Sequence, residues 1–139
     1  MKKIFKITFL IFLFSNPLFA QTQYLQEGIN LFKNNKFEEA KFKFEKDIVF
    51  NPKSELSYLY LSKIFKNLNK KNLQEQNLNT VILLNPENEE AILNLAKLKL
   101  ESSDYKKSKE LNARLNSFCR KFCNESKKLE IEIENLSKK

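Results

Sequence analysis

The chain has 139 residues, with 25 Lys or Arg against 17 Asp or Glu, and its formal net charge is +8. It contains no His and a single Gly, which removes the commonest general base and metal ligand and excludes glycine-rich phosphate loops. With 30% charged residues and only three Pro, the composition favours long helices in one domain.

Residues 1–20 have the three regions of a secretory signal peptide. Three of the first six residues are Lys, an apolar run covers residues 7–14, and Ala20 is the small residue expected directly before cleavage. The run is shorter than the roughly 20 residues that a membrane-spanning helix needs. We therefore expect cleavage after Ala20, which removes three lysines and lowers the charge from +8 to +5. The mature protein would be periplasmic or secreted, without a stable membrane span.

From residue 21 onward the chain repeats with a period of 34 residues. The dipeptide Asn-Pro occurs at Asn51 and again at Asn85. Other residues keep the same step without a gap: Leu25, Leu59 and Leu93; the small Gly28, Ser62 and Ala96; and Asn35, Asn69 and Ser103. A fixed period of this length indicates stacked structural repeats.

Each repeat unit has the pattern of two helices joined by a polar turn. In the first unit, apolar residues between positions 37 and 48 recur at steps of three and four, which places them on one helix face. Pro52 prevents this helix from fusing with the next one. Asn35 and Asn69 lie where the turn between the helices needs a left-handed backbone, which Asn tolerates better than most residues.

The small residues of the repeat predict where the two helices of a hairpin cross. Helix axes approach closely only where a side chain is nearly absent, and Gly28, Ser62 and Ala96 suit that position. We expect them to face Ala40 in the first unit and Ser108 in the third.

This pattern resembles the tetratricopeptide repeat (TPR) family of helix–turn–helix units. In the first unit, Tyr24, Gly28, Ala40, Phe44 and Pro52 stand at the aromatic, small, Ala, aromatic and Pro positions of the family signature. The resemblance implies an all-α, TPR-like α-α solenoid of about three helical hairpins. The predicted array covers residues 21–123, with units at about 21–54, 55–88 and 89–122.

After the third unit, Leu129 and the apolar residues that follow it at helical spacing form another face. A solenoid needs a last helix that covers its apolar end. We therefore predict a capping helix and tail over residues 124–139, starting at Asn124 or Ser126. One long helix running on from Asp104 is the alternative, which no Gly or Pro excludes, but it would leave the end of the stack uncovered.

Cys119 and Cys123 are the only cysteines. A disulfide between them suits an exported protein. Two cysteines four residues apart in an intact helix are poorly oriented for a disulfide, so this bond would require a break in the helix before the capping helix. The alternative is that both cysteines are reduced and buried as small apolar side chains. The spacing differs from that of redox motifs, and no His or further Cys completes a metal site. We expect no metal and no cofactor.

No catalytic site is indicated, because no nucleophile and base can be paired. The basic residues are scattered over the chain instead of clustered on one element, so nucleic acid is not expected as a ligand either. The remaining class of function is the binding of a protein or peptide.

The TPR resemblance implies that the first helices of the units line a concave groove. The groove positions are Leu25, Ile29 and Phe32 in the first unit, Leu59, Lys63 and Lys66 in the second, and Leu93, Lys97 and Leu100 in the third. Such a surface suits a segment with apolar anchors and acidic groups. Alternatively, the leucines only pack between neighbouring hairpins and the lysines form a solvated face.

The sequence thus predicts an exported interaction module that acts as an adaptor or assembly factor. A fixed structural subunit of a bacterial envelope complex is the alternative. Neither the partner nor the oligomeric state is indicated by any residue pattern.

Overall fold

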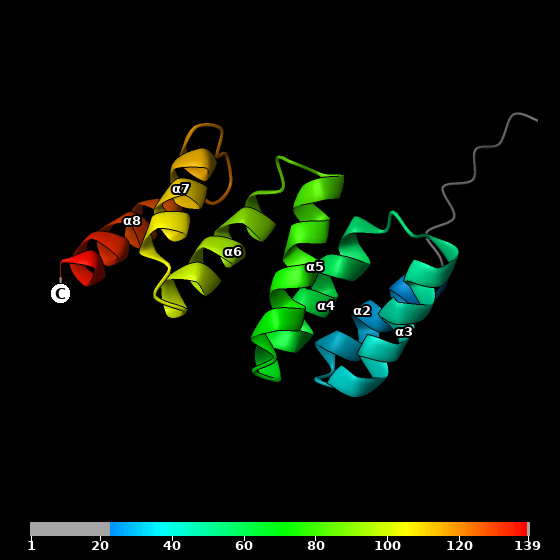
Figure 1. Ribbon diagram of the computed structural model, residues 1–139. Helices are drawn as coiled ribbons and strands as arrows, with labels where there is room; N and C mark the ends of the chain where they lie inside the picture. Colours follow the sequence, from blue (N-terminus) through cyan, green and yellow to red (C-terminus); the bar gives the residue numbers. More distant parts are fainter. Residues whose placement is uncertain (1–22, 139) are drawn as a thin grey trace, which may run out of the picture.

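The computed structural model describes residues 23–138, and in this part of the chain it contains seven helices and no strand (Figure 1). The helices are α2 (Gln23–Lys33), α3 (Phe37–Phe50), α4 (Glu55–Asn67), α5 (Lys71–Leu84), α6 (Glu89–Glu101), α7 (Tyr105–Asn116) and α8 (Cys123–Ser137). The predicted signal peptide and its cleavage site after Ala20 lie outside the described residues. None of the described helices combines the length and the hydropathy needed to cross a membrane.

Consecutive helices pair into hairpins, α2 with α3, α4 with α5 and α6 with α7 (Figure 1). The second helix of each hairpin then packs against the first helix of the next, and α7 packs against α8. The fold is therefore an all-α, TPR-like solenoid of three hairpins with α8 as its C-terminal capping helix.

The turns inside the hairpins share one backbone conformation. Asn35, Asn69 and Ser103 have φ values of 59°, 54° and 59°, in the left-handed region that most residues avoid. After each of them, the next amide donates to the carbonyl five residues earlier, at 2.9–3.0 Å, which satisfies carbonyls at the helix end. The prediction for Asn35 and Asn69 is confirmed, and Ser103 adopts the same conformation in the third hairpin.

The helix crossings depend on small residues in the first and third hairpins. In the third hairpin the Ser108 hydroxyl donates to the Ala96 carbonyl at 2.8 Å, as a close crossing requires. In the first hairpin a Cβ at Gly28 would lie nearest to the Phe44 ring, 2.7 Å from Cε1. The absent side chain of Gly28 therefore makes room for an aromatic ring.

Two apolar clusters form the core. The N-terminal cluster contains Phe44, Ile64 and Phe65 and spans α2 to α4. The C-terminal cluster contains Leu78 and Leu115 and extends from α4 to α8. Helix α4 supplies residues to both clusters and so joins them. Every residue of both clusters follows position 24, so a chain beginning at Gln21 retains the whole described core.

A buried polar network joins α3 to the start of α4. Asp47 is fully buried, and its Oδ2 atom accepts a hydrogen bond from the Ser57 hydroxyl at 2.5 Å. The Ser54 hydroxyl donates in turn to Ser57 Oγ at 3.1 Å. Burying a carboxylate is costly unless it accepts hydrogen bonds, so the Ser57 hydroxyl stabilises Asp47 where the second hairpin packs on the first.

The chain breaks between α7, which ends at Asn116, and α8, which begins at Cys123. The break predicted before the capping helix is confirmed, and one continuous helix from Asp104 is excluded. The predicted start at Asn124 or Ser126 is wrong, because the helix begins earlier and neither side chain caps it.

The loop before α8 is held by the Glu89 carboxylate at the start of α6. The carboxylate accepts hydrogen bonds from three consecutive backbone amides, those of Arg120 at 3.0 Å and of Lys121 and Phe122 at 2.9 Å. These bonds, with the Phe122 amide as the largest cause, lower the pKa of Glu89 below its ordinary value. Since the pairing spans more than 30 residues of sequence, local patterns did not predict it.

A buried pair of side chains completes the docking of α8. Asn112 Nδ2 donates to the Ser126 carbonyl at 3.0 Å, and the Ser126 hydroxyl donates to Asn112 Oδ1 at 2.7 Å. Ser126 is therefore the close contact of α8 with α7, a role like that of Ser108 in the third hairpin.

Candidate functional site

The nine residues predicted to line a groove fall into two groups. Leu25, Leu59, Leu93 and Leu100 are only 3–6% exposed. Leu25 belongs to the N-terminal cluster and the other three belong to the C-terminal cluster. They therefore pack between helices, as the alternative interpretation held, and they do not form an exposed apolar floor.

The other five predicted residues reach the surface of α2, α4 and α6. They are half-buried, except for Lys66, which is exposed. We call this surface the first-helix face and define it by Ile29, Phe32, Lys63, Lys66 and Lys97.

Aromatic rings order the N-terminal part of the first-helix face. Phe32 meets Tyr60 edge to face, with ring centroids 5.1 Å apart, and it meets Phe37 in the same way at 5.4 Å. Tyr60 stacks on the buried Phe44 ring at 5.0 Å. The sequence did not single out Tyr60, because the equivalent positions in the other units are polar residues and the repeat pattern carries no aromatic there.

The lysines of the first-helix face differ in their partners. Lys63 Nζ lies 2.8 Å from Glu90 Oε1, which ties α4 to α6, and it also lies 5.0 Å from the Tyr60 ring centroid. No described residue forms an ion pair with Lys66 or Lys97. Two ammonium groups on this face are therefore available to an acidic ligand.

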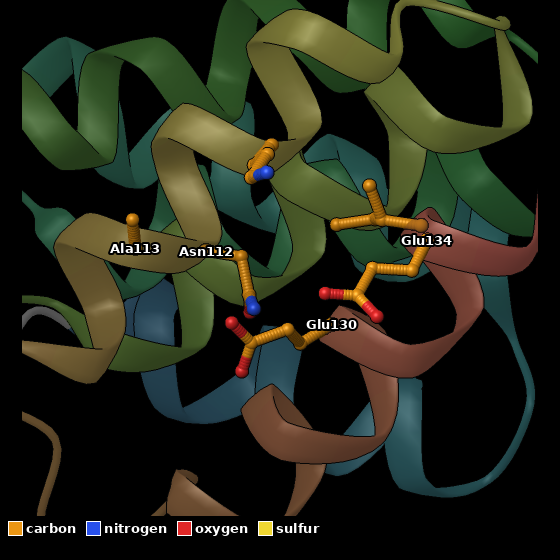
Figure 2. A pocket seen from close by; sticks show the side chains of 6 residues that line it. Asn112, Ala113, Glu130 and Glu134 are labelled. Atoms are coloured by element: carbon orange, nitrogen blue, oxygen red, sulfur yellow. The ribbon is translucent and has the colours of Figure 1, made fainter. Parts of the chain in front are cut away.

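Figure 2 shows a cavity between α7 and α8, with the Glu130 and Glu134 carboxylates directed toward it from α8. Its volume is about 40 Å³, and it is lined by Lys109, Asn112, Ala113, Glu130, Ile133 and Glu134. The cavity has room for a few water molecules only, so it is a packing gap beside the cap and not a ligand pocket.

In the part of the chain that the structure describes, no group of three or more His, Cys, Asp or Glu side chains lies close enough together to hold a metal ion. Cys119 and Cys123 are joined by a disulfide, with Cα atoms 5.3 Å apart. The disulfide closes the loop whose amides hold Glu89, so both cysteines belong to the attachment of the cap.

Comparison with known proteins gives matches at the level of structure alone. No protein-family model matches the sequence, and no curated protein is similar enough to be matched. The Yersinia enterocolitica type III secretion chaperone SycD, solved with a peptide of the translocator YopD, has a TM-score of 0.75 at 15% identity. That match covers 89% of this chain and 100% of SycD.

Two TPR domains match to a similar degree. The TPR2B domain of yeast Sti1, solved as a complex with pHsp70, has a TM-score of 0.74 at 14% identity and covers 83% of this chain and 99% of that domain. The TPR domain of Arabidopsis OM64 has a TM-score of 0.72 at 17% identity, over 81% and 92% of the two chains. The chain has the fold of a TPR domain. At such identities the match to TPR domains establishes the architecture, and the roles of individual residues rest on their own geometry.

Proposed function

We propose that this protein is an exported TPR module that binds a protein or peptide segment on its first-helix face and acts as an adaptor or assembly factor, without catalysis. The observation that carries the proposal is the presence of two lysines without an ion-pair partner among the described residues, Lys66 and Lys97, on the same face as Ile29 and Phe32. Carboxylates of a ligand would pair with the lysines, and its apolar side chains would contact Ile29 and Phe32.

The unpaired lysines contrast with the lysines that join helices elsewhere in the array. Lys43 pairs with Glu27 between α3 and α2, and Lys99 pairs with Glu75 between α6 and α5 at 2.6 Å. The hydrogen bond from Lys43 is the main cause that lowers the pKa of Glu27 below its ordinary value. Since intramolecular partners serve these lysines, Lys66 and Lys97 are the better candidates for contacts with another molecule.

The structural matches support a binding function of this kind. SycD was solved with a peptide of YopD, and the Sti1 domain was solved with pHsp70. Chaperones and interaction domains thus share this architecture, which favours a non-catalytic role here.

Export is supported by the signal-peptide pattern of residues 1–20 and by the disulfide, because disulfides persist outside the reducing cytoplasm. We therefore propose a location in the periplasm or outside the cell. Fractionation followed by N-terminal sequencing tests this directly: a mature chain beginning at Gln21 supports it, and a cytoplasmic chain that retains Met1 contradicts it.

The binding proposal is tested by affinity purification from cross-linked envelope fractions with three baits. One bait is the native protein, the second is Lys66→Glu/Lys97→Glu, and the control is Lys70→Glu/Lys71→Glu. The control makes the same charge change at exposed positions where the second hairpin turns. Lys63 is left unchanged, since its replacement would break the ion pair between α4 and α6.

A partner that the native and control baits retain and the Lys66/Lys97 variant loses, with its helix content unchanged, supports the proposal. A partner retained by all three baits shows that the first-helix face is not the binding site. If this protein disappears from the cell when its partner is deleted, the alternative of a fixed structural subunit replaces the adaptor.

A further inference from the structure

The loop between α7 and α8 combines a disulfide with a carboxylate that its backbone binds. Cys119 and Cys123 stand at its two ends, with Cα atoms 5.3 Å apart. The amides of the three residues between them all donate to the Glu89 carboxylate, at 2.9–3.0 Å. Consecutive amides converge on one anion only where the backbone is curved. The disulfide joins the ends of that curve, so it keeps the loop in the shape that binds Glu89.

The disulfide lies where a thiol reagent can reach and cleave it. Both cysteines are half-buried, at the border of the C-terminal cluster. Cys123 is the first residue of α8, and the Phe122 side chain before it provides no cap for this helix. A thiolate released at Cys123 would therefore lie at the positive end of the helix dipole, which stabilises negative charge. Since thiol–disulfide exchange is faster when the leaving thiolate is stabilised, this position favours reduction of the bond.

Apart from this loop, α8 has few attachments to the rest of the array. Only three of its fifteen residues are buried, Ser126, Leu129 and Ile133. The cavity of about 40 Å³ between α7 and α8 leaves a packing gap beside these residues (Figure 2). A helix that buries few groups opens locally at a low cost in free energy. The attachment of the loop to Glu89 is therefore a substantial part of what keeps α8 docked.

We propose that the Cys119–Cys123 disulfide is a redox-sensitive switch that controls the opening of the capping helix. In the reducing step, one thiolate of a dithiol attacks Cys119 Sγ and forms a mixed disulfide, and the S–S bond breaks with release of the Cys123 thiolate. The second thiol of the reagent then closes the reagent's own disulfide and displaces the Cys119 thiolate. Two electrons and two protons pass from the dithiol to the cysteine pair, which ends as two thiols.

Reduction acts on α8 through the loop. Without the covalent link the loop leaves its curved shape more easily, its amides separate from Glu89, and α8 moves away from α7. This opening uncovers part of the C-terminal cluster, to which Leu129 and Ile133 belong. Helix α8 packs mainly on α7 and α6, so α2 to α5 stay folded while it opens.

The test compares amide hydrogen exchange in the oxidised protein and after treatment with dithiothreitol, without denaturant. The chain runs from Gln21 to Lys139 and keeps every described helix and both core clusters. Maleimide labelling followed by mass spectrometry counts the free thiols, and circular dichroism shows that the reduced protein is folded. The variant Cys119→Ser/Cys123→Ser is the control for effects of the reagent itself, because it has no bond to reduce.

Two further variants test whether the disulfide acts through Glu89. Glu89→Gln removes the charge that the loop amides bind. Glu90→Gln makes the same change at the next residue, whose carboxylate pairs with Lys63 of α4 and not with the loop. Each variant is measured in the oxidised and the reduced form.

Reduction should increase exchange in α8 about twenty- to thirtyfold, which is the chain-entropy effect expected for a sequence separation of four. Exchange in α4 should not change. The double Ser variant should exchange like the reduced native chain with and without dithiothreitol. In Glu90→Gln the full increase should remain, whereas in Glu89→Gln it should shrink toward no change, because the loop is already loose in the oxidised form.

Four results would each overturn the proposal. The bond could resist dithiothreitol until the chain is unfolded, or reduction could leave exchange in α8 unchanged. An equal increase in α4 and α8 would show that the disulfide stabilises the whole array instead of the cap. An equal increase in Glu89→Gln and the native chain would show that the carboxylate does not connect the disulfide to the cap.

Discussion

Replacing the single glycine, Gly28→Ala, should destabilise the first hairpin, although alanine is the better helix former. The added Cβ would lie 2.7, 2.9 and 3.0 Å from Cε1, Cδ1 and Cζ of Phe44, where carbon atoms prefer about 3.5–4.0 Å. The ring has no room to withdraw, since Phe44 is fully buried and stacks on Tyr60.

The expected loss is the difference between two opposing effects. Forcing an extra methyl group into a packed core costs about 1–3 kcal/mol, and the helix preference of Ala over Gly returns about 1 kcal/mol. The net free energy of unfolding should therefore fall by up to about 2 kcal/mol in the Gly28→Ala variant.

Urea unfolding at constant pH measures the effect, and a second variant tests its cause. In the background of Phe44→Leu, which removes the outer ring atoms, the same Gly28→Ala change should become neutral or stabilising. Ala96→Gly is the comparison at the equivalent position of the third hairpin. It should cost about 1 kcal/mol of helix preference and about 1 kcal/mol more for the methyl group, since Ala96 is fully buried. If Gly28→Ala stabilises the native protein, or if its cost is unchanged beside Leu at position 44, the close approach to the ring is not the reason for the glycine.

Three further predictions concern the helix junctions. Because the pKa of Glu89 is lowered in the folded protein, its ionised carboxylate stabilises the fold above the ordinary pKa of 4.5, and this stability is lost as the pH falls through the lowered pKa. The urea midpoint of Glu89→Gln should therefore change less between pH 3 and pH 6 than that of the native protein. Ser57→Ala removes a donor from the buried Asp47 carboxylate and should cost about 1–3 kcal/mol in urea unfolding; an unchanged midpoint would contradict the importance of this network. Replacing Cys119 and Cys123 together by Ser should cost about 2 kcal/mol, as expected for a short closed loop, and amide exchange should increase in α8 while α2 and α3 keep their protection.

The sequence by itself determined the repeat architecture of this protein. A period of 34 residues, with Asn-Pro at Asn51 and Asn85, placed the helix pairs, because apolar spacing and helix-stopping residues act over a few neighbouring positions. The left-handed turns at Asn35 and Asn69 were predictable for the same reason, since the requirement for a positive φ is local.

Only the tertiary structure decided which side chains reach the surface. Leu25 and Lys97 both stand at family groove positions, but Leu25 is buried by neighbouring helices and Lys97 is not. The partners Glu90 for Lys63 and the loop amides for Glu89 lie roughly one repeat away in the sequence. Burial and pairing of this kind depend on how hairpins stack, and a pattern confined to one helix contains no information about its neighbour.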